Sequence, residues 1–273
     1  MTDALLDNSP GPAQADMTRP QPERVTAGAH GGLCLRPLAD YFFASRVMVT
    51  DIVAAELAQA AVSFPLAFAG GGDDLRLVAL LSTVADQNLF VSATGTWLTD
   101  FVPASLCTYP FTYQAPEDGG PAALYVDRAS GLLDPAEGAA LFTEAGKPSD
   151  KMKEMVRILR EYEKNRRLTR QICAALGRYG LLVPWGADCG VAALQGLLRV
   201  DEAALNRLPQ GMFSALRQAG ALPIAYAQLV SLALVPRLAG LARLHARAQE
   251  QRKQLLRSCF RQEDSILPDS FHF

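Results

Sequence analysis

The sequence has 273 residues, of which 49% are hydrophobic and 20% are charged, and its formal net charge is -2. This balance is typical of a globular protein long enough to bury a sizeable core. The small net charge argues against a protein drawn to nucleic acid or to an anionic membrane by its overall field. Five cysteines are widely spaced and form no CxxC pair, so neither a disulfide scaffold nor a zinc site is supported. We therefore expect buried free thiols and a cytoplasmic protein.

The start of the chain predicts a tail. Residues 1–32 are rich in Pro, Gly, Gln, Asp and Ser, which favours disorder, and they lack the basic start and apolar run of a secretory signal. We predict a disordered tail over residues 1–32, a single α+β domain over 33–260 and a C-terminal tail over 261–273.

The first half of the domain has mainly strand patterns. A short helix is expected over Asp51–Ala61, with Ile52, Val53 and Leu57 on one side. Strands are expected at Phe64–Ala69 and Leu75–Leu81, joined by the hairpin-like Gly70–Asp74, and then at Leu89–Ser92, Ala122–Val126 and Leu141–Phe142.

The second half has mainly helix patterns. An apolar stripe predicts a long helix over Ser149–Tyr179, and strands are expected at Leu181–Val183 and Val191–Val200. Short helices follow at Glu202–Leu208 and Gln210–Ala219. A final helix, Ile224–Arg257, should be kinked at Pro236. Strands first and helices later predict an α+β fold with two long helices and several short ones. We expect one mostly antiparallel sheet that contains the segments at Phe64, Leu75, Leu89 and Ala122.

One apolar stretch raises the question of a membrane. Ala221–Pro236 contains Gln228, Ser231 and two prolines, and it is shorter than the ~20 residues that a bilayer span requires. We therefore expect a buried helix and no membrane span.

The common catalytic and ligand-binding motifs are missing from the sequence. Gly70–Asp74 lacks the pattern of a phosphate loop, and no serine has a GxSxG motif. The histidines have no partner at metal-ligand spacing, and Cys107 has no nearby His, although the fold could bring a base to it. The basic long helices interleave acids and lack aromatics, so we interpret them as solvated faces and expect no nucleic-acid partner. No metal or cofactor is predicted.

The segment from Asn88 to Phe111 is the most distinctive, because it gathers aromatics and prolines around a single glycine turn. Asn88, Trp97, Tyr109 and Phe111 are the candidate binding residues. Tyr109 and Phe111 share one face of an extended segment, and rigid aromatics around a groove would suit a peptide. Core packing is the favoured alternative for the three aromatic residues.

These residues also carry a family resemblance. Phe64-Pro65, Asn88-Leu89-Phe90-Val91, Gly95-Thr96-Trp97 and Tyr109-Pro110-Phe111 resemble the SapC family of bacterial proteins, and the likeness runs over Tyr41–Leu238. The family tends to have Arg-Arg where this chain has Cys107-Thr108. If that basic pair contacts an anionic partner, this chain has lost or moved the contact.

The resemblance implies a role with bacterial surface-layer proteins, in their export or handling, and no catalytic residues. We therefore predict a non-enzymatic accessory protein with a protein or peptide partner, and leave a homo-oligomer open. The alternative is a peptide-modifying enzyme or its accessory subunit, working beside a flavin-dependent halogenase-like protein, since members look to be encoded near such proteins.

Overall fold

The computed structural model describes residues 22–114, 122–185 and 194–264, and it divides into two compact units. Unit 1 contains the chain up to Leu38 together with Tyr109–Leu159, and unit 2 contains Ala39–Thr108 together with the chain from Arg160 onward. The long helix α4 (Asp150–Arg178) begins in unit 1 and ends in unit 2. The sequence analysis predicts one domain over residues 33–260, and this stays a prediction.

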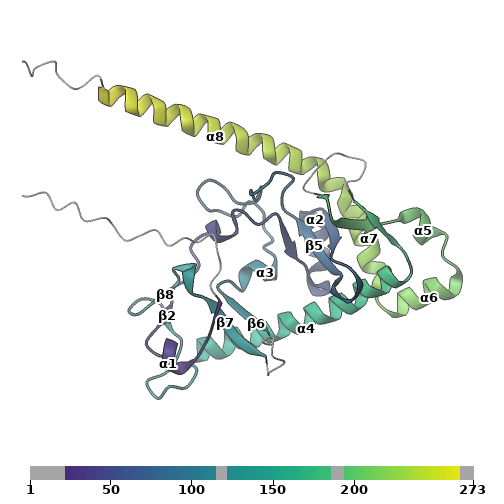
Figure 1. Cartoon of the computed structure of the whole chain (residues 1–273), viewed down its shortest axis with the longest axis horizontal. Helices are drawn as coiled ribbons and strands as arrows, with labels where there is room; N and C mark the ends of the chain where they lie inside the picture. The colour runs from purple at the N-terminus through teal and green to yellow at the C-terminus, as the bar shows by residue number, and fades with distance from the viewer. Residues whose placement is uncertain (1–21, 115–121, 186–193, 265–273) are drawn as a thin grey trace, which may run out of the picture. The chain divides into compact units, whose positions relative to one another are not determined.

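Unit 1 is built on two small antiparallel sheets with strand orders β1-β7-β6 and β8-β2-β9 (Figure 1). Its core consists of Phe111, Leu124, Val126, Leu141, Met152 and Leu159. Its elements before α4 are β1 (Pro22–Arg24), α1 (Ala27–His30), β2 (Cys34–Leu35), β6 (Phe111–Gln114), β7 (Ala123–Asp127), η4 (Arg128–Ser130), β8 (Leu133–Asp134) and β9 (Ala139–Ala140).

The predicted tail over residues 1–32 needs correction where the structure describes it. Pro22–Arg24 forms β1 and pairs antiparallel with β7, and Thr26 caps α1 by accepting a hydrogen bond from the Ala29 backbone nitrogen. His30 is fully buried. Residues 1–21 lie outside the described part of the chain. At the other end, α8 (Val235–Asp264) continues to residue 264, four residues into the predicted C-terminal tail, and the rest of that tail is not described.

Unit 2 has a five-stranded antiparallel sheet in the order β10-β11-β4-β5-β3 (Figure 1). Its core includes Phe64, Phe68, Phe90, Leu77 and Leu80, each at most 1% exposed. Besides the end of α4, its elements are η1 (Phe42–Ala44), β3 (Val49–Asp51), η2 (Ala54–Glu56), α2 (Leu57–Ser63), β4 (Leu66–Ala69), η3 (Gly72–Asp74), β5 (Arg76–Leu80), α3 (Ala104–Cys107), β10 (Leu182–Pro184), β11 (Leu197–Val200), α5 (Glu202–Asn206), α6 (Gln210–Gln218), α7 (Ala221–Ser231), η6 (Leu232–Leu234) and α8.

The α+β class, the antiparallel pairing and the two long helices α4 and α8 are confirmed. The expectation that the strands at Phe64, Leu75, Leu89 and Ala122 share one sheet is wrong. The first two lie in the sheet of unit 2, and the last lies in a sheet of unit 1. Leu89–Ser92 forms only an isolated bridge between Val91 and Trp97, because the chain turns back on itself there. Of the predicted strand Val191–Val200, residues 191–193 lie outside the described residues, and β11 forms its end.

Helix α7 is fastened to the sheet by two buried polar side chains. Gln228 accepts a hydrogen bond from the Val200 nitrogen and donates to the Leu66 carbonyl. Ser231 accepts from the Leu66 nitrogen. Both side chains are fully buried, so each satisfies backbone groups that would otherwise be unpaired at the junction of β4 and β11.

The long C-terminal helix is interrupted by a 3-10 turn. The turn η6 ends just before α8, and Pro236 is the second residue of α8, where a proline is tolerated. A kink was predicted at Pro236. The structure instead has a 3-10 turn that interrupts the helix just before this proline. The stretch Ala221–Leu255 is long and apolar enough to cross a membrane by length and composition, with a mean hydropathy of 1.5 over its best window. A core helix passes the same test when it is mostly buried. In this stretch 28% of the window is buried, and α7 is held to the sheet by hydrogen bonds.

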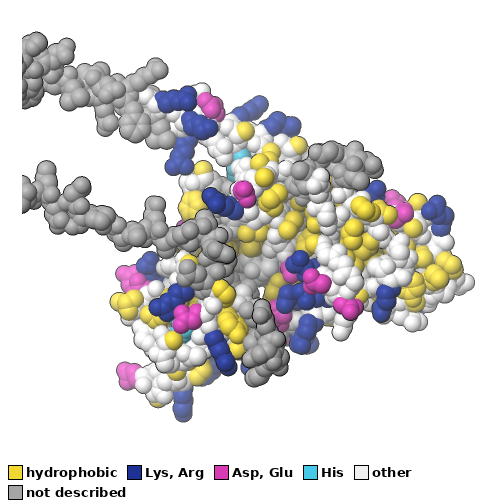
Figure 2. Space-filling model, in the orientation of Figure 1, with side chains coloured by type: hydrophobic (Ala, Val, Ile, Leu, Met, Phe, Trp, Pro, Cys, Tyr) yellow, Lys and Arg dark blue, Asp and Glu magenta, His cyan; other side chains and the backbone are white. Residues whose placement is uncertain are grey.

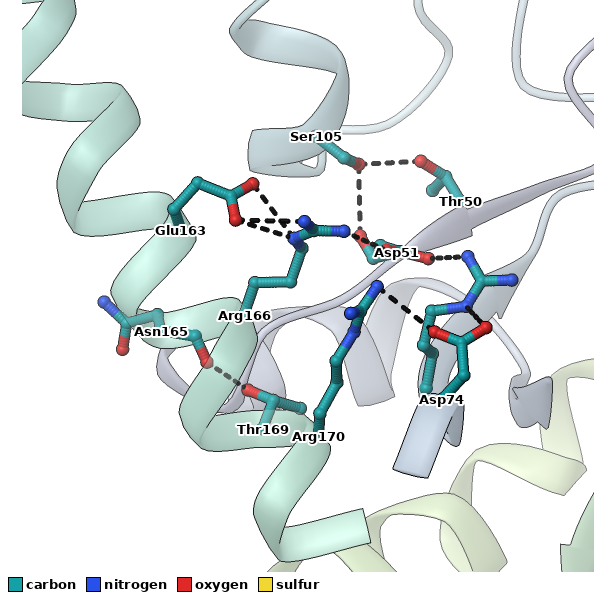
Figure 3. A network of polar contacts seen from close by, with 10 residues as sticks. Thr50, Asp51, Asp74, Ser105, Glu163, Asn165, Arg166, Thr169 and Arg170 are labelled. Carbon is teal, nitrogen blue, oxygen red and sulfur yellow. Dashed lines mark hydrogen bonds and ion pairs between the residues drawn. The ribbon is translucent and has the colours of Figure 1, made fainter. Parts of the chain in front are cut away.

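A polar network joins α4 to the sheet within unit 2 (Figure 3). Asp51, at the end of β3, accepts a hydrogen bond of 2.9 Å from Arg76 of β5, and its other oxygen lies 4.0 Å from Arg166 of α4. Arg166 is also paired with Glu163 at 2.9 Å. The network continues through Thr50, Asp74, Ser105, Asn165, Thr169 and Arg170. Its arginines and carboxylates neutralise one another, so we interpret it as a structural clamp.

Candidate functional site

Unit 2 contains a groove of about 740 Å³ with three walls. The first wall is the segment of residues 42–46, the second is the loop of residues 86–98, and the third is one face of α8. Its lining is Phe42, Ser45, Arg46, Asp86, Gln87, Asn88, Val91, Ser92, Ala93, Leu98, Leu241, Leu244, His245, Ala248, Gln249 and Arg252. Figure 2 shows Lys and Arg side chains along α8 and exposed hydrophobic side chains beside it.

The α8 wall is a single stripe of the helix. Its groove-lining residues recur at spacings of three and four along 15 positions, from Arg237 of an adjoining hollow to Arg252. Residues at this spacing lie on one face of a helix, and 15 residues span about 22 Å. Leu244 is 59% exposed on this stripe, and Leu98 of the facing loop is 45% exposed, so two large apolar side chains lie open in the same groove.

Asn88 fastens the first two walls together. Its side-chain nitrogen donates to the Ala44 carbonyl at 3.0 Å, and its side-chain oxygen accepts from the Phe90 nitrogen at 2.9 Å. Its backbone nitrogen donates to the Ser45 carbonyl at 2.6 Å. Only 1% of Asn88 is exposed. It therefore sets the geometry of the groove and offers little surface of its own.

His245 fastens the third wall. Its Nε2 atom donates a hydrogen bond of 3.0 Å to the carbonyl oxygen of Leu89, which lies 156 positions earlier in the sequence. A carbonyl oxygen can only accept, so Nε2 carries a hydrogen. This contact ties α8 to the loop that Asn88 holds.

Gly95 allows the loop to approach the first wall. Its φ is +80°, and a Cβ atom there would lie 2.8 Å from the Phe42 ring and from Asp40 Cβ. Its carbonyl accepts a hydrogen bond from the Tyr41 nitrogen at 2.8 Å. A glycine is needed both for the left-handed turn and for the close packing against Phe42.

A second, smaller hollow adjoins the groove. It has a volume of about 470 Å³ and shares Leu98 with the groove. It is lined by Gln59, Val62, Ser63, Leu98, Thr99, Asp100, Phe101 and Arg237. The second hollow reaches α8 at Arg237 and meets the groove at Leu98, so the combined surface is elongated from Arg237 to Arg252.

The groove combines an apolar floor with separated charges. Arg46 and Arg252 come from different walls, and neither forms an ion pair with any residue in the described ranges. Asp86 is the one carboxylate in its lining. The backbone of Asp86 has a φ of 53°, a left-handed conformation that Asp tolerates better than most residues.

The four predicted binding residues are divided between the two units. Trp97 lies in unit 2 and is 8% exposed, whereas Phe111 lies in the core of unit 1 and is 1% exposed. Trp97 packs against Tyr41, Phe64 and Phe90, and its Nε1 atom donates to the Phe101 carbonyl at 2.9 Å. The turn at Gly95 thus directs Trp97 into the core of unit 2.

Tyr109 is half-buried in unit 1, and its hydroxyl donates to Asp127 at 3.1 Å. Burial raises the pKa of Tyr109, and the Asp127 carboxylate raises it further. Burial thus favours core packing for Trp97 and Phe111. Asn88 is the one predicted residue that lines the groove, from a buried position.

The sequence analysis expects the free thiols to be buried, and the described cysteines meet this expectation only in part. Cys173 is fully buried, and burial raises its pKa to about 12. Cys34 is half-buried and Cys107 is exposed. The pKa of Cys107 is raised by desolvation and by the charge of Glu56, which keeps the thiol protonated. In the described ranges no cluster of three His, Cys, Asp or Glu residues could hold a metal ion.

Comparison with known proteins supports the resemblance. The family model described as SapC matches residues 25–238. No curated protein and no solved structure matches the chain. The match includes the first two walls of the groove and ends before the α8 residues that form the third. Because the matched region covers well over half of its length, the chain belongs to the SapC family.

Proposed function

We propose that this protein is a non-enzymatic accessory protein that holds a segment of a partner protein in the groove between the 86–98 loop and α8. Its proposed role is in the handling or export of surface-layer or other secreted proteins, in the cytoplasm. Membership of the SapC family and the implied role of that family support the biological setting. The groove supports the molecular activity.

The observation that carries the proposal is the exposed apolar stripe of α8 facing a preformed loop. The groove volume lies in the range of about 300–1,000 Å³ that is usual for ligand sites. Its walls are joined by the hydrogen bonds of Asn88 and His245, so little ordering is needed before a partner binds.

The enzymatic alternative has less support in this site. Cys107, the nucleophile considered in the sequence, does not line the groove, and its raised pKa disfavours the reactive thiolate. The polar network of Figure 3 is internally neutralised and holds α4 against the sheet.

Site-specific photocrosslinking in cells that make the protein tests this proposal. A photoreactive residue would replace Ala248, which lines the groove, and in a second variant Ala246, which is exposed on the same helix outside the groove lining. The proposal predicts a discrete adduct with a secreted or surface protein from position 248 and none from position 246. Equal adducts from both positions, or none from position 248, would contradict it.

A further inference from the structure

Resting on the proposed function, we infer that the groove takes an extended acidic segment of about seven residues, with apolar side chains at its centre and a carboxylate near each end. The groove side of α8 begins at Arg237 and ends at Arg252, and both side chains are exposed. The two residues are 15 positions apart, which is about 22 Å along the helix. An extended chain covers that length in about seven residues at about 3.3 Å each.

The charges of the lining indicate an acidic occupant. Arg252 at one end and Arg46 on the facing wall form no ion pair with any residue in the described ranges. Arg237 at the other end likewise forms none there. The two lining carboxylates, Asp86 and Asp100, are outnumbered by these three guanidinium groups. Carboxylates on the occupant would complement them, since Arg binds carboxylates in a planar, two-pronged geometry.

The floor between these charges is apolar. Val91, Leu98, Leu241 and Leu244 lie in the lining, and Leu98 continues it into the second hollow. Leu98 is 45% exposed and Leu244 is 59% exposed. Two or three apolar side chains of an occupant would cover these residues and remove their surface from water.

The polar side chains of the walls favour an extended backbone over a helix. Ser45, Gln87 and Gln249 line the groove. An extended segment carries unpaired N–H and C=O groups that such side chains can satisfy, whereas a helix satisfies its own. The elongated surface also suits a chain better than a compact small molecule.

Fluorescence anisotropy with synthetic peptides tests this inference directly. The probe is Glu-Ser-Leu-Ser-Leu-Ser-Glu, in which alternation puts both Glu and both Leu on one face of the extended chain, and its controls replace both Glu by Lys, or both Leu by Ser. A 15-residue Ala-rich helical peptide with Glu at each end represents the helical alternative. We expect binding of the first probe only, and roughly tenfold weaker binding by Arg252→Glu.

Charge reversal makes the result specific to the groove. Arg252→Glu should gain affinity for the Lys-ended peptide, and the matched variant Arg243→Glu, on the same helix but outside the lining, should bind the acidic probe as the wild type does. Preference for the helical or the Lys-ended peptide, equal loss in Arg243→Glu, or no binding of the acidic probe would overturn the inference. If position 248 still crosslinks to a secreted protein in any of these cases, the proposed function stands and only the partner chemistry is wrong.

Discussion

His245 Nε2 lies 3.0 Å from the Leu89 carbonyl oxygen, and this hydrogen bond joins α8 to the loop that forms the facing wall of the groove. Losing it should loosen α8. We expect His245→Ala to lower the free energy of unfolding by about 1 kcal/mol, the usual value for one hydrogen bond. The amides of residues 241–252 should exchange faster with deuterium. His245→Gln, which keeps a nitrogen donor, should restore part of the protection, and unchanged exchange in His245→Ala would contradict the account.

Asn88 should be far more important for stability than its size suggests. Asn88→Ala leaves the Ala44 carbonyl and the Phe90 nitrogen without their partner in a buried place. An unsatisfied buried polar group costs about 1–3 kcal/mol. Urea denaturation should therefore show that the free energy of unfolding falls by about this amount for each of the two groups. Asn165→Ala is a matched control on α4, where the amide bonds an exposed Glu161. A loss as small as about 0.5 kcal/mol for Asn88→Ala would contradict its role between the walls.

Trp97 should behave as a core residue. Trp97→Ala removes a ring packed against Tyr41, Phe64 and Phe90, and large aromatic truncations in a core cost about 3–5 kcal/mol. Tyr109→Phe removes the hydroxyl that donates to Asp127 and should cost about 1 kcal/mol. Thermal melting measures both. Full stability of Trp97→Ala would return Trp97 to the list of candidate binding residues.

The reactivity of Cys107 should report its environment. Cys107 is exposed, but partial desolvation by its surroundings and the charge of Glu56 raise its pKa above the ordinary value of 9.0, so less of the thiol is ionised at any pH below that value. Iodoacetamide should therefore modify Cys107 more slowly in the folded protein than in urea, as followed by mass spectrometry of its peptide. Glu56→Gln removes a negative charge, so it should shift the rate profile to lower pH. A folded-state profile centred at or below 9.0 would contradict this interpretation.

The sequence was sufficient for the elements whose patterns are long. The apolar stripe of α4 and the apolar runs of strands β4 and β5 lie close to their predicted ranges. It missed β3, because three residues are too few for a pattern, and it assigned Pro22–Arg24 to a tail, because pairing with β7 depends on residues about 100 positions away.

The groove could not be predicted because its walls are distant in sequence, at residues 42–46, 86–98 and 241–252. The sequence analysis identified Asn88 as a candidate contact for a ligand. It could not show that the side-chain amide of Asn88 already forms hydrogen bonds with the backbone of Ala44 and Phe90. One available signal was the stripe of α8. Leu241, Leu244 and Ala248 recur at helical spacing, and such a stripe is ordinarily assigned to the core.

The central claim is that the groove face of α8 binds a partner, and a single charged residue placed there tests it most directly. Leu244→Asp changes a side chain that is 59% exposed, and Leu168→Asp changes one that is 49% exposed on α4 outside the groove. Both variants should melt as the wild type does. With the photoreactive residue at position 248, we predict that Leu244→Asp loses the partner adduct and Leu168→Asp keeps it. A full adduct in a folded Leu244→Asp variant would contradict the account.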